Sequence, residues 1–253
     1  MLFYWFLKFV AIGPLATLVF RPRAEGREHV PAEGAAILAS NHLAASDWVF
    51  MPMCLRRRVT FLAKAEYFTG RGLKGRLRRA FFSGAGQVPI DRSSATAAEG
   101  AIRTGIRMLE QGRLLGIYPE GTRSPDGRLY RGKTGVARMA LETGVPVIPL
   151  AVTYTPRRIP FGKKLVKVSV RFGEPLDFSR YEGLAGDRFV ERSITDEIMY
   201  EIMTLSGQEY VDVYGATVKK RMDATGASAS DVVSRLEPPV DEAGDRAPDS
   251  LAG

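Results

Sequence analysis

The chain has 253 residues, of which 45% are hydrophobic and 25% are charged. This composition fits a globular protein with a sizeable core, and it excludes collagen, global disorder and a disulfide-rich scaffold. The 36 Lys and Arg residues outnumber the 28 Asp and Glu residues, for a net charge of +8. This excess favours an anionic partner, such as nucleic acid, a membrane surface or a phosphorylated substrate. Since Cys54 is the one cysteine, an internal disulfide and a multi-cysteine metal site are excluded.

The first twenty residues are almost all apolar, and Lys8 is their only charge. As a helix this segment would be about 30 Å long, close to the thickness of a bilayer core. Arginines follow it, where a signal peptide would have small residues at its cleavage site. We therefore expect residues 1–22 to form a membrane-associated helix, either spanning or interfacial, with an apolar helix packed on the core as the alternative. The arginines favour a position of the following domain on the cytoplasmic side of the cell membrane.

Short apolar runs alternate with helical patterns across residues 23–222. Strands are predicted at 35–39, 59–63, 87–90, 114–118, 145–152 and 165–172. Helices are predicted at 47–55, 65–82, 95–111, 134–143, 187–205 and 209–220. This order predicts an α/β domain with a mixed, largely parallel sheet flanked by helices.

The C-terminal residues 223–253 differ in composition from the rest of the chain. They hold seven acids and two arginines, are rich in Ala, Ser, Gly and Pro, and contain few large apolar residues. Such a segment buries too little surface to offset the entropy lost on ordering, so we expect it to be disordered. The positive charge is therefore concentrated in the folded domain.

A histidine and an aspartate, His42 and Asp47, lie between the first predicted strand and the helix after it. Histidine suits proton transfer near neutral pH, and a carboxylate can fix its tautomer and stabilise its charged form. Within one regular helix, residues five apart point about 140° away from each other. The pair therefore requires His42 in the turn and Asp47 in the first helical turn. The alternative is a structural histidine, with Asp47 or Ser46 as the helix N-cap.

Two other strands also end in polar residues. Arg92 follows the strand at 87–90, where an arginine can bind a phosphate through two hydrogen bonds. The alternative is a surface ion pair with Asp91. Residues 118–124 (YPEGTRS) follow the strand at 114–118, and this loop can present backbone donors and an arginine to an anion. A simple turn is the alternative there.

Residues 127–134 match the phosphate-loop pattern G-x-x-x-x-G-K-[ST], with Lys133 and Thr134 at its end. That motif should follow directly on a strand, whereas here the strand ends near Tyr118 and a loop intervenes. A P-loop nucleotide hydrolase is therefore a distant alternative.

Residues 56–79 carry nine cations and one acid, Glu66, interleaved with aromatic residues and leucines. A solvated helix face explains many such runs, but cations beside an anionic leaflet also contribute to membrane binding. The chain shows no nucleic-acid recognition motif, and it begins with an apolar segment. We therefore expect a phospholipid surface as a partner and no nucleic acid. A membrane-binding module without catalytic activity is a further alternative.

Four segments, taken together and in this order, resemble the 1-acylglycerol-3-phosphate acyltransferase family, within the wider glycerolipid acyltransferases. They are Asn41-His42 with Asp47, residues 86–92, residues 118–124 and residues 145–150. Residues 61–64 and 132–140 are also similar to the family. One departure is Ala44, where many members have serine.

The resemblance implies an acyltransferase domain docked on a membrane, with His42 as general base and Asp47 as its partner. It implies that the substrate is bound by Arg92, Lys64, Glu120, Gly121, Thr122 and Arg123. The acceptor would be lysophosphatidate and the donor acyl-CoA or acyl carrier protein, with no metal and no bound cofactor. Another lyso-lipid or a glycolipid as acceptor is the alternative.

Overall fold

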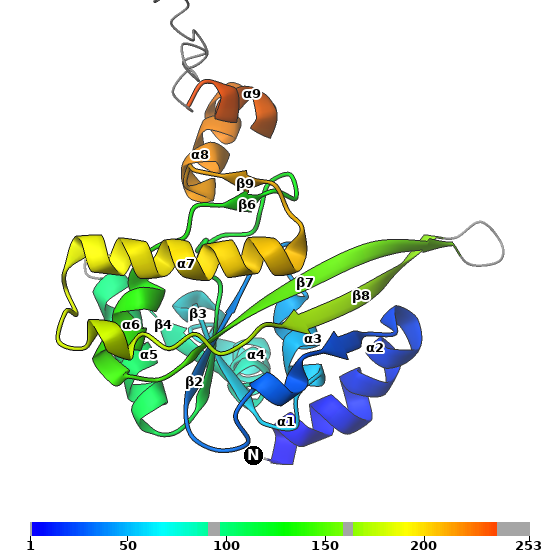
Figure 1. Cartoon of the computed structure of the whole chain (residues 1–253). Coiled ribbons are helices and arrows are strands. Elements are labelled where there is room, and N and C mark those ends of the chain that lie inside the picture. Colours follow the sequence, from blue (N-terminus) through cyan, green and yellow to red (C-terminus); the bar gives the residue numbers. More distant parts are fainter. Residues whose placement is uncertain (1, 91–96, 159–163, 237–253) are drawn as a thin grey trace, which may run out of the picture.

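A seven-stranded sheet forms the centre of the domain in the computed structural model, which describes residues 2–90, 97–158 and 164–236 (Figure 1). The strand order is β1-β8-β7-β2-β5-β3-β4. The strands are β1 (Arg23–Glu25), β2 (Ala36–Ser40), β3 (Val59–Lys64), β4 (Gln87–Ile90), β5 (Leu114–Ile117), β7 (Val147–Arg158) and β8 (Lys164–Phe172). Among the strands of the described residues, only β7 and β8 pair antiparallel within this sheet. The predicted mixed, largely parallel sheet is confirmed.

Helices cover both faces of the sheet, so the central strand β2 is buried on both sides. Leu38 packs in one core cluster with α3, and Ile37 packs in the other with α5, α6 and α7. Both side chains are fully buried. This explains why β2 is continuously apolar rather than alternating. The helices are α3 (Asp47–Met53), α5 (Ala97–Glu110), α6 (Gly135–Thr143) and α7 (Arg188–Ser206).

The parallel strands β2, β3, β4 and β5 all end at the same edge of the sheet. The turn that holds His42 follows β2, and the loop that begins at Tyr118 follows β5. Because β2 and β5 are neighbours, this topology places two segments that are far apart in the sequence side by side.

The helix predicted at 65–82 is two elements. A 3-10 turn covers Ala65–Tyr67, and α4 spans Gly72–Gly84. Gly72, the first residue of α4, has a φ of +69°, so one regular helix cannot run from the 3-10 turn through this position.

The helix predicted at 209–220 is also wrong at its start. Residues Tyr210–Val211 form β9, which pairs with β6 (Leu129–Tyr130), and α8 spans Gly215–Thr225. The aromatic and β-branched pair at 210–211 favours a strand, and its partner lies 81 residues earlier in the chain.

The expectation of disorder from residue 223 is wrong for residues 223–236. The helix α8 runs to Thr225, and α9 follows at Ala229–Ser234. Ser228 caps α9 by accepting a hydrogen bond from the Asp231 N–H. Val232 and Val233 are buried in a third cluster with Tyr130 and Val218, so a few apolar residues suffice where an existing surface covers them. Residues 237–253 lie outside the described part of the chain.

The N-terminal segment consists of α1 (Leu2–Phe6), a π-helical stretch (Leu7–Ala11) and α2 (Ile12–Phe20). Within the described residues, it is the one helix whose length and apolar composition would suffice to cross a membrane. The π-helical stretch precedes Pro14, which has no N–H to donate to the preceding turn.

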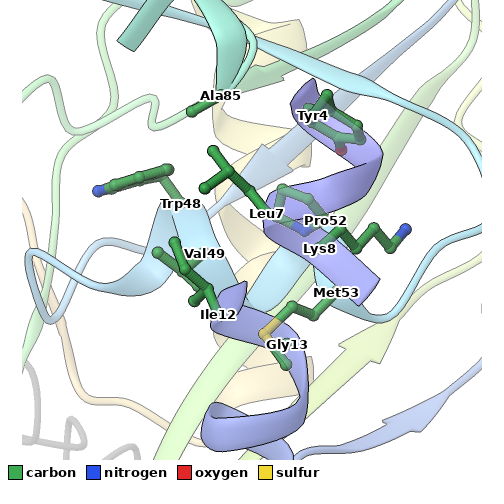
Figure 2. A pocket seen from close by; sticks show the side chains of 10 residues that line it. All are labelled: Tyr4, Leu7, Lys8, Ile12, Gly13, Trp48, Val49, Pro52, Met53 and Ala85. Carbon is green, nitrogen blue, oxygen red and sulfur yellow. The ribbon is translucent and has the colours of Figure 1, made fainter. Parts of the chain in front are cut away.

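One face of this segment contacts the domain. The Tyr4 hydroxyl accepts a hydrogen bond from the Val59 N–H at 3.3 Å, and the Lys8 ammonium donates to the Leu55 carbonyl. A small apolar pocket lies between the segment and α3 (Figure 2). Its lining residues are Tyr4, Leu7, Lys8, Ile12, Gly13, Trp48, Val49, Pro52, Met53 and Ala85.

Candidate active site

His42 and Asp47 lie in contact at the carboxyl end of β2. His42 is in the turn after the strand, Asp47 is the first residue of α3, and their Nδ1 and Oδ2 atoms are 2.8 Å apart. The Asp47 side chain is fully buried, whereas that of His42 is 18% exposed. The structure therefore brings the pair together in the geometry that the spacing required.

The Asp47 carboxylate accepts hydrogen bonds on both of its oxygens. Besides the imidazole, Oδ2 accepts the N–H groups of Leu43 and Ala44, at 2.8 and 2.9 Å, and Oδ1 accepts the hydroxyl of Tyr154. A carboxylate that only accepts requires a proton on Nδ1 of His42. The Nε2 atom is then left with its lone pair, as a general base requires.

An aromatic stack covers one face of the histidine. The His42 and Tyr118 rings are stacked with centroids 3.9 Å apart, and Tyr118 stacks in turn on Phe61 at 6.0 Å. Burial and the Asp47 charge raise the pKa of Tyr118, so its phenol stays neutral. Its hydroxyl has no hydrogen-bond partner among the described residues. The stack fixes the plane of the imidazole.

Glu120 is almost fully buried beneath the same turn. Its Oε1 accepts the His42 N–H at 3.0 Å, and its Oε2 accepts the Tyr130 N–H at 3.1 Å. Burial raises the pKa of Glu120 to about 7, although these two hydrogen bonds and Lys219 oppose the shift. The carboxylate thus connects the histidine turn to β6. Direct contact between Glu120 and a substrate stays a prediction.

The rest of the loop after β5 curves around the histidine turn. Gly121 has a φ of +69°, which favours glycine, and the Ser124 N–H donates to the His42 carbonyl at 2.7 Å. The Thr122 hydroxyl accepts from the Lys219 ammonium at 3.1 Å. Arg123 is exposed and has no acceptor among the described residues. The loop therefore carries an exposed cation next to Ser124, the residue whose backbone contacts His42.

The two other predicted binding residues are only partly placed. Lys64 ends β3 and pairs in register with Ile90 of β4, at the sheet edge that holds His42. Its side chain is not described, and Arg92 lies outside the described residues. Their substrate contacts stay predictions.

The phosphate-loop pattern at 127–134 does not form a phosphate loop. Leu129 and Tyr130 form β6 and are fully buried, and the Tyr130 N–H points to Glu120 rather than to an open cradle. The geometry gives no support to the nucleotide hydrolase alternative.

Sequence reasoning missed two side chains that hold the turn. The Asn41 side chain donates to the Val152 carbonyl at 3.0 Å and accepts the Val152 N–H at 2.8 Å, which joins the turn to β7. Tyr154, two residues further along β7, reaches Asp47. The only sequence signal was a tyrosine just beyond an apolar strand, and the contact spans 107 residues.

Comparison with known proteins gives consistent results. Residues 21–153 match the family model described as Acyltransferase. The chain is 31% identical to the 1-acyl-sn-glycerol-3-phosphate acyltransferase of Escherichia coli over 177 residues, which are 67% of this chain and 68% of that protein. It is also 31% identical to the protein of that name from Limnanthes douglasii, over 61% of this chain.

A solved structure is similar as well. The crystal structure of the 1-acyl-sn-glycerophosphate acyltransferase from Thermotoga maritima matches with a TM-score of 0.52 and 26% identity. The match covers 73% of this chain and 71% of that one. In contrast, the matched region spans about half the length of the Limnanthes proteins, at 54% and 53%.

Proposed function

Since the chain belongs to the acyltransferase family, we propose that it transfers a fatty acyl group from an acyl thioester to the free hydroxyl of lysophosphatidate, forming phosphatidate in phospholipid biosynthesis. The observation that carries this proposal is the His42–Asp47 pair at the carboxyl end of β2. The relatives named for the same reaction support the choice of acceptor.

The pair performs the proton transfer in this proposal. Nε2 of His42 takes the hydroxyl proton as the acceptor oxygen attacks the thioester carbonyl. The C–S bond then breaks as the ester forms, and the protonated His42 gives its proton to the departing thiolate. Asp47 holds the reactive tautomer and stabilises the imidazolium. Positioned proton transfer of this kind contributes about 10²- to 10⁴-fold to a rate. The substrates supply the hydroxyl and the thioester, so no metal or bound cofactor is part of these steps.

Phosphate binding positions the hydroxyl. Arg123 is exposed in a loop that is hydrogen-bonded to the His42 turn, and its guanidinium can hold a phosphate through two hydrogen bonds. An acceptor fixed by its phosphate presents its hydroxyl to Nε2 in a limited range of orientations. Arg92 and Lys64 belong to this phosphate site in the proposal.

The apolar pocket beside α3 is the place that we assign to the acyl chain. The helix α3 begins with Asp47, and its later residues Trp48, Val49 and Pro52 line the pocket (Figure 2). Such a lining favours a hydrocarbon chain, because burial of apolar surface stabilises the complex. The pocket fits either donor, acyl-CoA or acyl carrier protein, since both present the same thioester.

We assign the N-terminal segment to the membrane interface rather than to a span. Tyr4 and Lys8 fix one face of it to the domain, while Leu2, Phe6, Phe9, Val10, Leu15 and Leu18 are exposed. A helix held along the domain surface in this way can bury its free face in one leaflet. The arginines that follow favour the cytoplasmic leaflet.

The test is an acyl-transfer assay on the purified protein with lysophosphatidate and a panel of acyl donors, followed by mass spectrometry. Wild type should form phosphatidate, and His42→Ala should abolish turnover. His29→Ala is the matched control, because His29 contacts Phe172 and Glu174 instead of the site. Near-normal turnover by purified His42→Ala would refute the mechanism. If a competition assay shows a preference for another lyso-lipid, that lipid replaces lysophosphatidate as the proposed acceptor.

A further inference from the structure

A lysine from the C-terminal part of the chain reaches the loop after β5. The helix α8 lies beyond residue 153, where the family match ends, and it packs beside β6 and β9 (Figure 1). From this helix the Lys219 ammonium donates to the Thr122 hydroxyl at 3.1 Å. The loop that holds Arg123 therefore receives a second cation from a distant element.

The two cations repel each other. Burial and the neighbouring Arg123 lower the pKa of Lys219, while Glu120 and Asp223 oppose the shift. Neither acid forms a hydrogen-bonded ion pair with the lysine among the described residues. Like charges held together at a loop without such a counter-ion favour the binding of an anion, because the anion relieves their repulsion.

Hydrogen-bond donors of the Lys219 ammonium also lack acceptors among the described residues. An ammonium has three N–H donors, and Thr122 is the only acceptor that the described residues offer to Lys219. Since the Thr122 oxygen accepts from Lys219, its own proton is not used in that bond. Lys133, which follows β6, packs against Gly121 of this loop. A Cβ added to Gly121 would lie 3.3 Å from the Lys133 ammonium. The side chain of Lys133 also has no acceptor in the described structure.

We propose that Lys219, together with Arg123 and the Thr122 hydroxyl, binds the phosphate of the acceptor, so that the C-terminal helix α8 completes the substrate site. This inference rests on the proposed function, and it adds a residue outside the region that matches the family. The ligand class is a phosphate monoester on a glycerol backbone.

The experiment compares Lys219→Met with Lys220→Met, its exposed neighbour on α8, and with Lys219→Arg, which keeps the cation. Steady-state assays use lysophosphatidate and, separately, a monoacylglycerol without phosphate. Binding of glycerol 3-phosphate is measured by calorimetry, which needs no turnover. Circular dichroism and thermal melting check the fold of each variant.

Loss of one charge-assisted hydrogen bond should weaken phosphate binding about tenfold. We expect Lys219→Met to raise KM for lysophosphatidate and Kd for glycerol 3-phosphate by that factor, and to reduce the preference for the phosphorylated acceptor. Lys220→Met should match wild type, and Lys219→Arg should recover most of the binding. Unchanged glycerol 3-phosphate binding in Lys219→Met would overturn the inference. So would a loss confined to kcat or to thermal stability, which indicates a structural role.

The two proposals fail separately. If wild type binds glycerol 3-phosphate through Lys219 but transfers no acyl group to lysophosphatidate, the proposed reaction is wrong and the phosphate site holds. If wild type acylates lysophosphatidate and Lys219→Met is indistinguishable from it, only the site is wrong.

Discussion

At the scale of single residues, Asp47 is held by more donors than the histidine alone. Two backbone N–H groups and the Tyr154 hydroxyl keep its carboxylate in place. An amide in the same position would have one acceptor oxygen. It could not accept from both Tyr154 and the His42 turn. Asp47→Asn should therefore lower kcat by about 10²-fold or more. Steady-state assays on protein with an unchanged circular dichroism spectrum test this, and a kcat within twofold of wild type would contradict it.

Tyr154 is predicted to act through Asp47 as a positioning residue. Tyr154→Phe keeps the ring and removes the hydroxyl that donates to Oδ1. A lost hydrogen bond to a charged group corresponds to about tenfold in rate. We expect that loss in kcat, with little change in KM. Tyr200→Phe, at an exposed position of α7, is the control. Equal kcat for both variants would show that the hydroxyl does not position the pair.

The raised pKa of Glu120 predicts that the free energy of unfolding depends on pH. Its folded pKa of about 7 lies above the ordinary value of 4.5, so the folded protein holds this proton more tightly than the unfolded chain does. The resulting stability is complete below pH 4.5 and falls as the pH rises to about 7. The loss should be on the order of 3 kcal/mol. Urea unfolding across this range should show that Glu120→Gln lacks this fall, whereas identical slopes would contradict the assignment.

At the scale of elements, strand prediction succeeded where both faces of a strand are buried. Leu38 and Ile37 pack in different clusters, so β2 reads as an apolar run without any alternation. The short strand β1 and the pair of β6 with β9 have two or three residues each, too few to show a pattern. They form because tertiary neighbours supply their partners.

The site was predictable only to the extent that it is local. His42 and Asp47 are five residues apart, and a turn followed by a helix brings them together. Tyr154 and Lys219 come from 107 and 97 residues away from their partners. Their contacts depend on the strand order and on where α8 packs. No spacing rule contains that information.

The pocket beside α3 predicts an effect on acyl-chain preference. Val49→Trp fills space that we assign to hydrocarbon (Figure 2). Because each excluded methylene loses about 0.8 kcal/mol, activity with long-chain donors should fall by tenfold or more relative to short-chain donors. The ratio of kcat/KM values for the two donors measures this, and the short-chain donor serves as the internal control. An unchanged ratio would place the chain elsewhere.

At the scale of the whole molecule, positive charge and exposed apolar side chains support the proposed contact with a bilayer. The chain carries +8 overall, and its N-terminal segment exposes large apolar side chains. Replacing Leu15 and Leu18 by serine should weaken binding to anionic phosphatidylglycerol vesicles more than tenfold, since each buried leucine contributes about 1.5–3 kcal/mol. Leu184→Ser, at an exposed loop position, is the control in the same sedimentation assay. Equal binding by all three proteins would contradict the docking surface.

The pairing of β1 with β8 also orders events during synthesis. Residues 23–25 lie directly after the apolar segment, yet their partners in the sheet are residues 169–171. The ribosome therefore releases the apolar segment well before the strand that completes this edge of the sheet. During that interval the segment is tethered to an incomplete domain and is already able to meet a bilayer. Under the proposed membrane assignment, attachment to lipid can thus precede closure of the fold and the locking of the His42–Asp47 turn.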